Sequence, residues 1–138
     1  TPEPEALLPT VAVAASSPRL LKRKLVYSHH IIADAKRAGL RELSVALNVT
    51  TLCKIGWPGV LVLEGDAASV EVYVAVIQKW RWKHLVVRGE QEIDAMPTLD
   101  SVRALPKAFV EFGPNQMSDL ARTCREAGLD DLFRRVFK

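Results

Sequence analysis

Strand-like and helical apolar patterns alternate in a fixed order from residue 24 to residue 89 of this chain. Runs rich in β-branched and aromatic residues predict strands, and apolar residues spaced three and four apart predict helices. The sequence Gly56-Trp57-Pro58-Gly59 is a turn by composition, so the strands on either side of it form a hairpin. The predicted elements are, in order, a strand at 24–32, a helix at 33–48, strands at 50–55 and 60–64, a helix at 67–79 and a strand at 83–89.

The order strand-helix-strand-strand-helix-strand is that of an α+β fold with a ferredoxin-like βαββαβ core. Its antiparallel sheet carries both helices on one face, and its first and third strands are central. Residues 90–107 contain two prolines and no firm period, which predicts a loop. A short strand at 108–112, followed by helices at 114–127 and 130–137, predicts a C-terminal helical extension.

Length and composition indicate one folded domain with a tail. The 138 residues suit a single domain. Apolar residues make up 49% and charged residues 25%, which is ordinary for a globular protein. The start of the chain is rich in Pro, Ala and Ser, so we expect residues 1–23 to be a tail or linker and residues 24–138 to be the ferredoxin-like domain. Such a tail favours a longer parent protein with another domain upstream.

Cysteine usage and the length of apolar runs bear on the compartment. Cys53 and Cys124 lie in apolar patterns without metal-binding spacing, which predicts two reduced core residues. No apolar run approaches the roughly 20 residues of a membrane-spanning helix. We therefore expect no membrane association and an intracellular location, in the nucleus or cytoplasm, with an organelle left open.

The positive charge of the chain lies in two blocks. The net charge is +3 and the isoelectric point is about 9.0. Residues 19–41 carry seven basic side chains and one acid, and residues 79–89 carry four basic side chains and no acid. The fold decides whether the two blocks meet on one surface.

Tryptophans accompany the second basic block. The run Lys79-Trp80-Arg81-Trp82-Lys83 alternates cations and rings, as in proteins that bind single-stranded nucleic acid. The alternative is that both tryptophans complete the core at a corner between a helix and a strand. Trp57, in the Pro-Gly turn, is either an anchor for protein or RNA or a ring folded back on its own domain.

The sequence contains no recognisable motif for catalysis or metal binding. Neighbouring residues on a strand point to opposite faces, so His29 and His30 cannot easily share one metal. We expect one of them to pack or hydrogen-bond within the fold and one to contact a phosphate or a partner. The sequence has no nucleophile elbow, no phosphate-binding loop and no dinucleotide fingerprint. The expectation is therefore a protein that is not an enzyme, with no cofactor, metal or small-molecule substrate.

A series of short motifs resembles a known family over about residues 25–137. It resembles the C-terminal domain of the RWD-domain-containing protein two family, which is related to the domain that closes the spliceosomal small nuclear ribonucleoprotein Prp-three. The resemblance implies a ferredoxin-like core, and in the splicing protein the related domain binds RNA. Trp57 stands where the family usually has lysine. The motifs are Tyr27-Ser28-His29-His30-Ile31, Lys36-Arg37, Gly56-Trp57-Pro58-Gly59-Val60, Glu64-Gly65, Arg81-Trp82-Lys83, Arg88, Phe109-Val110-Glu111, Met117-Ser118-Asp119-Leu120 and Gly128-Leu129-Asp130-Asp131-Leu132-Phe133.

These observations predict a non-catalytic RNA-associated or ribonucleoprotein-assembly module, whose partners are RNA or a ribonucleoprotein and other proteins. The alternative is a protein–protein scaffold domain, or a subunit of a large complex, without direct RNA contact. The predicted RNA-binding residues are Lys22, Arg23, Lys24, His30, Lys36, Arg37, Trp57, Arg81, Lys83 and Arg88.

Overall fold

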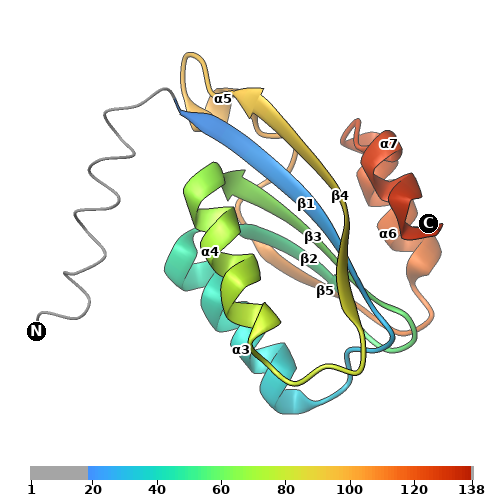
Figure 1. Ribbon diagram of the computed structural model, residues 1–138. Coiled ribbons are helices and arrows are strands. Elements are labelled where there is room, and N and C mark those ends of the chain that lie inside the picture. Colours follow the sequence, from blue (N-terminus) through green and yellow to red (C-terminus); the bar gives the residue numbers. More distant parts are fainter. Residues whose placement is uncertain (1–18, 138) are drawn as a thin grey trace, which may run out of the picture.

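The computed structural model describes residues 19–137 and contains one five-stranded sheet with helices on both faces (Figure 1). The strand order across the sheet is β4-β1-β3-β2-β5. The strands are β1 (Leu20–Ser28), β2 (Thr50–Lys54), β3 (Gly59–Asp66), β4 (Leu85–Asp94) and β5 (Phe109–Phe112). The helices are α3 (Asp34–Leu47), α4 (Ala67–Gln78), α5 (Leu99–Val102), α6 (Met117–Glu126), α7 (Asp130–Phe133) and the 3-10 helix η1 (Arg134–Phe137).

The first four strands and the helices α3 and α4 form a ferredoxin-like βαββαβ core. β1 lies between β3 and β4 and is antiparallel to both, and β2 and β3 form the predicted hairpin. The helices α3 and α4 cover one face of this sheet, whereas α6, α7 and η1 cover the other face (Figure 1). The predicted fold class, with its C-terminal helical extension, is confirmed.

The fifth strand changes one detail of the predicted sheet. β5 pairs in parallel with β2, so β2 is an inner strand rather than an edge. The chain reaches β5 by crossing from β4, at the opposite edge of the sheet, through the segment that contains α5. Helices cover both faces of the sheet, so the faces have little open surface for a ligand. The ends of the sheet remain open.

Two hydrophobic cores lie on the two sides of the sheet. One contains Cys53 and Tyr73 between the sheet and the helices α3 and α4. The other contains Cys124 and Phe133 between the sheet and the C-terminal helices. Both cysteines are buried free thiols, as predicted, and burial raises the pKa of Cys53 to about 12 and that of Cys124 to about 11. Neither thiol is therefore a nucleophile near neutral pH.

Residues with cap or left-handed backbone geometry mark the ends of α3 and α6 and the start of α4. Asn48 follows α3 in the left-handed conformation (φ 55°), and Gly128 follows α6 with φ 79°. The Asp66 carboxylate caps α4 by accepting a hydrogen bond from the Ala68 amide at 3.2 Å. α3 begins without such a cap, because its cap residue is Ala33 and makes no side-chain hydrogen bond.

Several element boundaries differ from the sequence prediction, and three of them matter for the charged residues or the C-terminal helices. β1 begins at Leu20 rather than at residue 24, so the end of the predicted tail belongs to the sheet; the rest of that tail, residues 1–18, lies outside the described residues. β4 continues to Asp94, where a loop was predicted, and α6 begins at Met117 rather than at Pro114. The extra lengths of β1 and β4 pair Lys22 with Glu92 and Lys24 with Glu90. Cross-strand ion pairs replace apolar alternation there, so hydrophobic periodicity could not reveal them.

A buried carboxylate joins the crossing segment to the sheet. Glu64 of β3 has no solvent exposure and accepts hydrogen bonds from the amides of Ala104 at 2.8 Å and Leu105 at 3.0 Å. Its other partners are the guanidinium groups of Arg23 at 2.7 Å and Arg103 at 3.6 Å. The network holds the segment after α5 against β3, and thereby fixes the route of the chain to β5.

Replacing Glu64 with glutamine tests this network. The neutral side chain leaves Arg23 and Arg103, whose side chains are each 8% exposed, without their buried counter-charge. We expect Glu64→Gln to lower the free energy of unfolding by about 3–5 kcal/mol, measured by urea denaturation.

The exposed ion pair between Asp119 and Arg122 provides the matched control. Asp119→Asn also neutralises one carboxylate, and it should change the free energy of unfolding by about 1 kcal/mol or less. Equal losses in the two variants would contradict a special role for the buried carboxylate.

Candidate nucleic-acid interface

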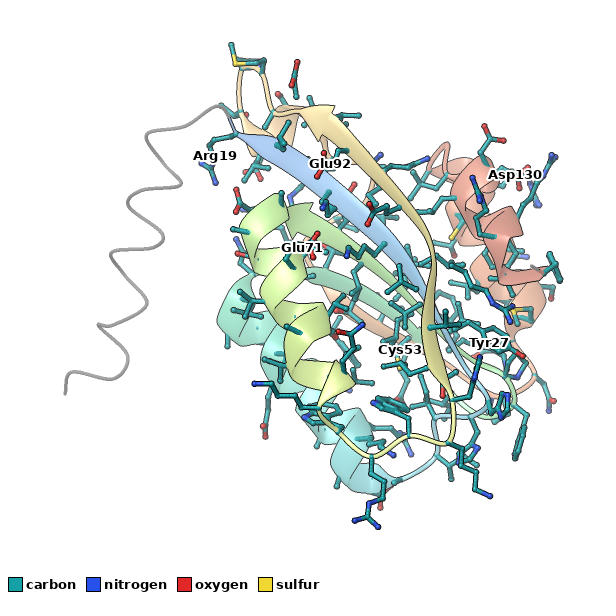
Figure 2. All side chains as sticks on the ribbon, viewed as in Figure 1. Arg19, Tyr27, Cys53, Glu71, Glu92 and Asp130 are labelled. Carbon is teal, nitrogen blue, oxygen red and sulfur yellow. The ribbon has the colours of Figure 1, made fainter. Side chains whose placement is uncertain are left out.

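The two basic blocks of the sequence do not meet on one surface. Lys22 and Lys24 of β1 both form ion pairs with Glu71 of α4, and Lys22 also pairs with Glu92 of β4 at 2.8 Å (Figure 2). The pKa of Lys22 is raised, chiefly by its hydrogen bond with Glu71 and then by that with Glu92.

Arg23 of β1 points to the other side of the sheet, where it belongs to the Glu64 network. Residues 22–24 are thus buried and neutralised by acids of three neighbouring elements. The prediction that they form a phosphate-binding surface does not fit this geometry, because strand register brings carboxylates to them that lie 40 or more residues away in sequence.

Three loops that lack any acidic residue meet at one end of the sheet. They are residues 29–33 after β1, residues 55–58 between β2 and β3, and residues 79–84 before β4. Register places Ser28, at the end of β1, opposite both Gly59 and Leu85, so the three loops lie together at the lower end of the sheet in Figure 1. We call these three loops the loop end.

Trp57 is the exposed aromatic residue of the loop end. Its side chain lies at the tip of the turn between β2 and β3, and the residue is 66% exposed. Its ring lies 4.7 Å from the His30 ring, centroid to centroid, at a tilt of 39°. His30 Nδ1 is buried and has no hydrogen-bond partner among the described residues. The indole therefore contacts its own domain through one ring and leaves most of its surface exposed.

The second basic block supplies free cations to the loop end. Lys79, Arg81 and Lys83 are exposed, and within residues 19–137 no ion pair involves them. This segment has no carboxylate opposite it, in contrast to residues 22–24. Its cations are therefore available to an anionic partner.

Trp80 and Trp82 are partly buried in the core and partly exposed. Both are half-buried and pack against the core beside α3 and α4, and the Trp82 Nε1 donates a hydrogen bond to the Ile77 carbonyl at 2.7 Å. Their rings are near-parallel, with centroids 6.3 Å apart, and their remaining exposed surface faces the solvent. They border a shallow pocket of about 360 Å³ that is lined by Gln78, Trp80, Trp82, Lys83, His84 and Leu85.

The sequence prediction left two histidines of this end out of the site. His29 and His84 stack at 4.5 Å with an angle of 23° between their rings. Tyr27 meets His84 edge-on at 6.1 Å. Their separation of 55 residues in sequence hides the pair, and only the pairing of β1 with β4 brings them together.

Lys36, Arg37 and Arg88 have different places in the structure. The Lys36 ammonium of α3 lies 4.5 Å from the centroid of the Trp82 ring, so it lies beside the loop end. Arg37 makes two hydrogen bonds of 2.9 Å to the Glu111 carboxylate and thereby lowers the pKa of Glu111. Arg88 stacks 3.6 Å above Tyr27 and donates to the carbonyl of Val136. Arg37 and Arg88 are therefore engaged in contacts within the fold, away from the loop end.

The loop end thus retains part of the predicted site. His30, Trp57, Arg81 and Lys83 lie there, with Lys36 beside them, whereas the other predicted residues are held in ion pairs and packing elsewhere. Residues 19–137 contain no group of three or more His, Cys, Asp or Glu side chains that could hold a metal ion. None of the helices described is long and apolar enough to cross a membrane.

The two adjacent histidines follow β1 instead of lying within it, so the argument from strand faces does not apply to them. His29 nevertheless turns to His84 and His30 to Trp57. Their rings have separate partners.

Comparison with known proteins identifies the fold. No protein-family model matches the chain. The structure is similar to BlrP1 BLUF, with a TM-score of 0.58, 17% identity and coverage of 86% of this chain and 85% of that one. It is also similar to the dark state of BlrB, a BLUF protein, with a TM-score of 0.57, 17% identity and coverage of 86% and 96%.

A bacterial light-regulated adenylyl cyclase matches with a TM-score of 0.51 and 16% identity over 83% of this chain. The chain spans 34% of the length of that protein. At these identities the likeness establishes the ferredoxin-like architecture alone.

The pH dependence of stability tests whether the basic residues of β1 are structural. Lys22 and Lys24 lower the pKa of Glu71 below its usual 4.5. A carboxylate with a lowered pKa stabilises the fold above its unfolded pKa, and this contribution is lost as the pH falls through the folded value. We expect Glu71→Gln to be less stable than the native protein at pH 7, and the difference to shrink below about pH 4.5.

Urea denaturation from pH 7 to pH 3 measures this difference. Glu42→Gln, at an exposed position of α3, neutralises a carboxylate without a described ion pair and should show no such trend. A Glu71→Gln difference that stays constant across the whole range would show that its pairing with the two lysines does not stabilise the fold.

Proposed function

We propose that this protein is a non-catalytic RNA-associated or ribonucleoprotein-assembly module that binds RNA at its loop end. One observation carries the proposal: three loops without a single acid gather free cations, the exposed Trp57 and the half-buried Trp80 and Trp82 at the same end of the sheet. Cations of this kind follow the phosphates of a single strand, and rings stack on its bases.

The covered sheet favours the loop end over the sheet faces. Many small RNA-binding domains present an open sheet on which aromatic residues stack bases. Here α3 and α4 cover one face and α6, α7 and η1 cover the other (Figure 1). A nucleic acid therefore has no sheet face to occupy, and the strand ends with their loops remain.

The arrangement of groups suits an unpaired strand. Trp57 offers a ring at one side of the loop end, and the pocket beside Trp80 and Trp82 offers mainly polar walls, which include Lys83, at the other. Arg81 and Lys83 lie exposed at that second side. The resemblance to the domain of the splicing protein, which binds RNA, supports RNA as the nucleic acid.

A protein scaffold remains the second candidate because of Trp57. A tryptophan that is 66% exposed on a Pro-Gly turn is also the type of residue that anchors a protein interface. A contact of that kind depends mainly on apolar burial, so it responds little to salt. The two functions therefore predict different salt dependence at the same residue.

Charge reversal in the second basic block tests the proposed function. The double variant Arg81→Glu with Lys83→Glu should reduce affinity for single-stranded RNA more than tenfold, because it replaces attraction to phosphate with repulsion. The slope of log affinity against log salt should become shallower by about 1.4, since each lost phosphate contact to a single strand contributes about 0.7. Fluorescence anisotropy with a labelled oligonucleotide at several salt concentrations measures both quantities.

The matched control reverses two arginines on α6. Arg122→Glu with Arg125→Glu makes the same change in net charge on a helix that covers the far face of the sheet. It should alter affinity and salt slope much less than the loop-end variant. Equal effects of the two double variants would mean that binding follows net charge instead of a site.

Trp57→Ala tests the stacking contribution. Loss of one stacked base costs about 1–3 kcal/mol, so RNA affinity should fall roughly 5- to 150-fold while the salt slope stays unchanged. Unchanged RNA affinity, combined with the loss of protein partners that co-purify with the native protein, would favour the scaffold function instead.

A further inference from the structure

Lys54 is a buried lysine whose three donors all bind the backbone of one turn. It is the last residue of β2 and is 1% exposed. Its Nζ donates to the carbonyls of Ile55 at 3.2 Å, Trp57 at 3.1 Å and Pro58 at 3.0 Å. An ammonium group has three hydrogens, so no donor is left for a ligand.

The positive charge of Lys54 has no carboxylate partner within residues 19–137. Burial alone lowers its pKa, with no opposing contribution from an acid. An unpaired charge away from water is unfavourable, and an apolar side chain at the same place would avoid this penalty. The hydrogen bonds to the three carbonyls offset this penalty in part. The role of the lysine is therefore to be found in the turn to which the carbonyls belong.

The three carbonyls bound by Lys54 belong to the turn that carries Trp57. The start of this turn is also fixed from its other side, where Gly56 and Ile31 exchange backbone hydrogen bonds of 2.8 and 3.1 Å. Gly56 has φ 85° and lies against Pro114, whose Cβ would be 2.7 Å from an added side-chain carbon. Lys54 and the Ile31–Gly56 bridge therefore hold the backbone of the turn between them.

We infer that Lys54 is a positioning residue: it does not touch the RNA, but it holds the turn so that the Trp57 indole is presented to the RNA. The inference rests on the proposed function of the loop end. A ring on a fixed backbone loses little conformational freedom on binding, so more of its stacking energy becomes affinity. Release of the turn removes this advantage even when the indole is still present.

A double-mutant cycle tests the inference in the full chain. Lys54→Met keeps the length of the side chain and removes all three donors. We expect Lys54→Met to lower affinity for a single-stranded RNA oligonucleotide by no more than Trp57→Ala does, and the variant with both changes to bind no more weakly than Trp57→Ala alone. In combination with Arg81→Ala, whose residue has no contact with the turn, the two fold-changes should multiply.

The failure of this inference differs from the failure of the proposed function. Fold-changes of Lys54→Met and Trp57→Ala that multiply, or a Lys54→Met variant that binds as tightly as the native protein while Trp57→Ala binds weakly, would overturn the positioning role alone. Normal RNA binding by Trp57→Ala and by the charge-reversed variant would overturn the proposed function, and the positioning role with it.

A second variant applies if Lys54→Met does not fold. Gly56→Ala displaces the same turn by another route, because an alanine is strained at φ 85° and its Cβ would meet Pro114. It should show the same lack of additivity with Trp57→Ala. Gly113→Ala is the matched control, since its added carbon meets only the flexible Gln116 side chain at 3.2 Å, and its effect on RNA affinity should be small.

Discussion

Acidic side chains of β3, α4 and β4 neutralise the basic residues at the start of β1. This pairing separates the first basic block, which is neutralised, from the second basic block, which is not. Glu64 binds Arg23 on one side of the sheet, while Glu71 and Glu92 bind Lys22 on the other. These carboxylates extend β1 and β4 and fix the segment that leads to β5. The three loops at the far end contain no acid of their own, so Lys79, Arg81 and Lys83 stay outside any ion pair within residues 19–137.

The same architecture decides where a ligand can bind. Helices cover both faces of the sheet, so its ends are the open parts (Figure 1). At the loop end, Lys54 anchors the turn of Trp57 by hydrogen bonds to its carbonyls, and Trp82 is held by its hydrogen bond to Ile77. The aromatic residues thus stand on hydrogen-bonded backbone beside exposed cationic side chains such as Lys83. Fixed rings next to adaptable charges suit a flexible, charged polymer better than a compact small molecule.

Most of the fold and about half of the residues of the candidate site could be predicted from the sequence. Apolar periodicity located α3, α4 and the hairpin because burial sets those patterns, and Asn48 and Gly128 marked helix ends through backbone geometry. The start of β1 and the end of β4 escaped detection because charge pairing across strands leaves no hydrophobic period in either strand. The free or paired state of each cation depends on partners far away in sequence, such as Glu111 for Arg37. Distance in sequence likewise concealed the stacking of His29 on His84.

Backbone amide shifts during titration with a single-stranded RNA oligonucleotide test the central claim most directly. A ¹⁵N-labelled protein should show its largest shift changes in residues 29–33, 55–58 and 79–84, with residues 22–24 and helix α6 little affected. The changes should diminish as salt is raised, because phosphate contacts release counterions. Shift changes centred on α6 and η1, or none at all at low salt, would contradict the assignment of RNA binding to the loop end.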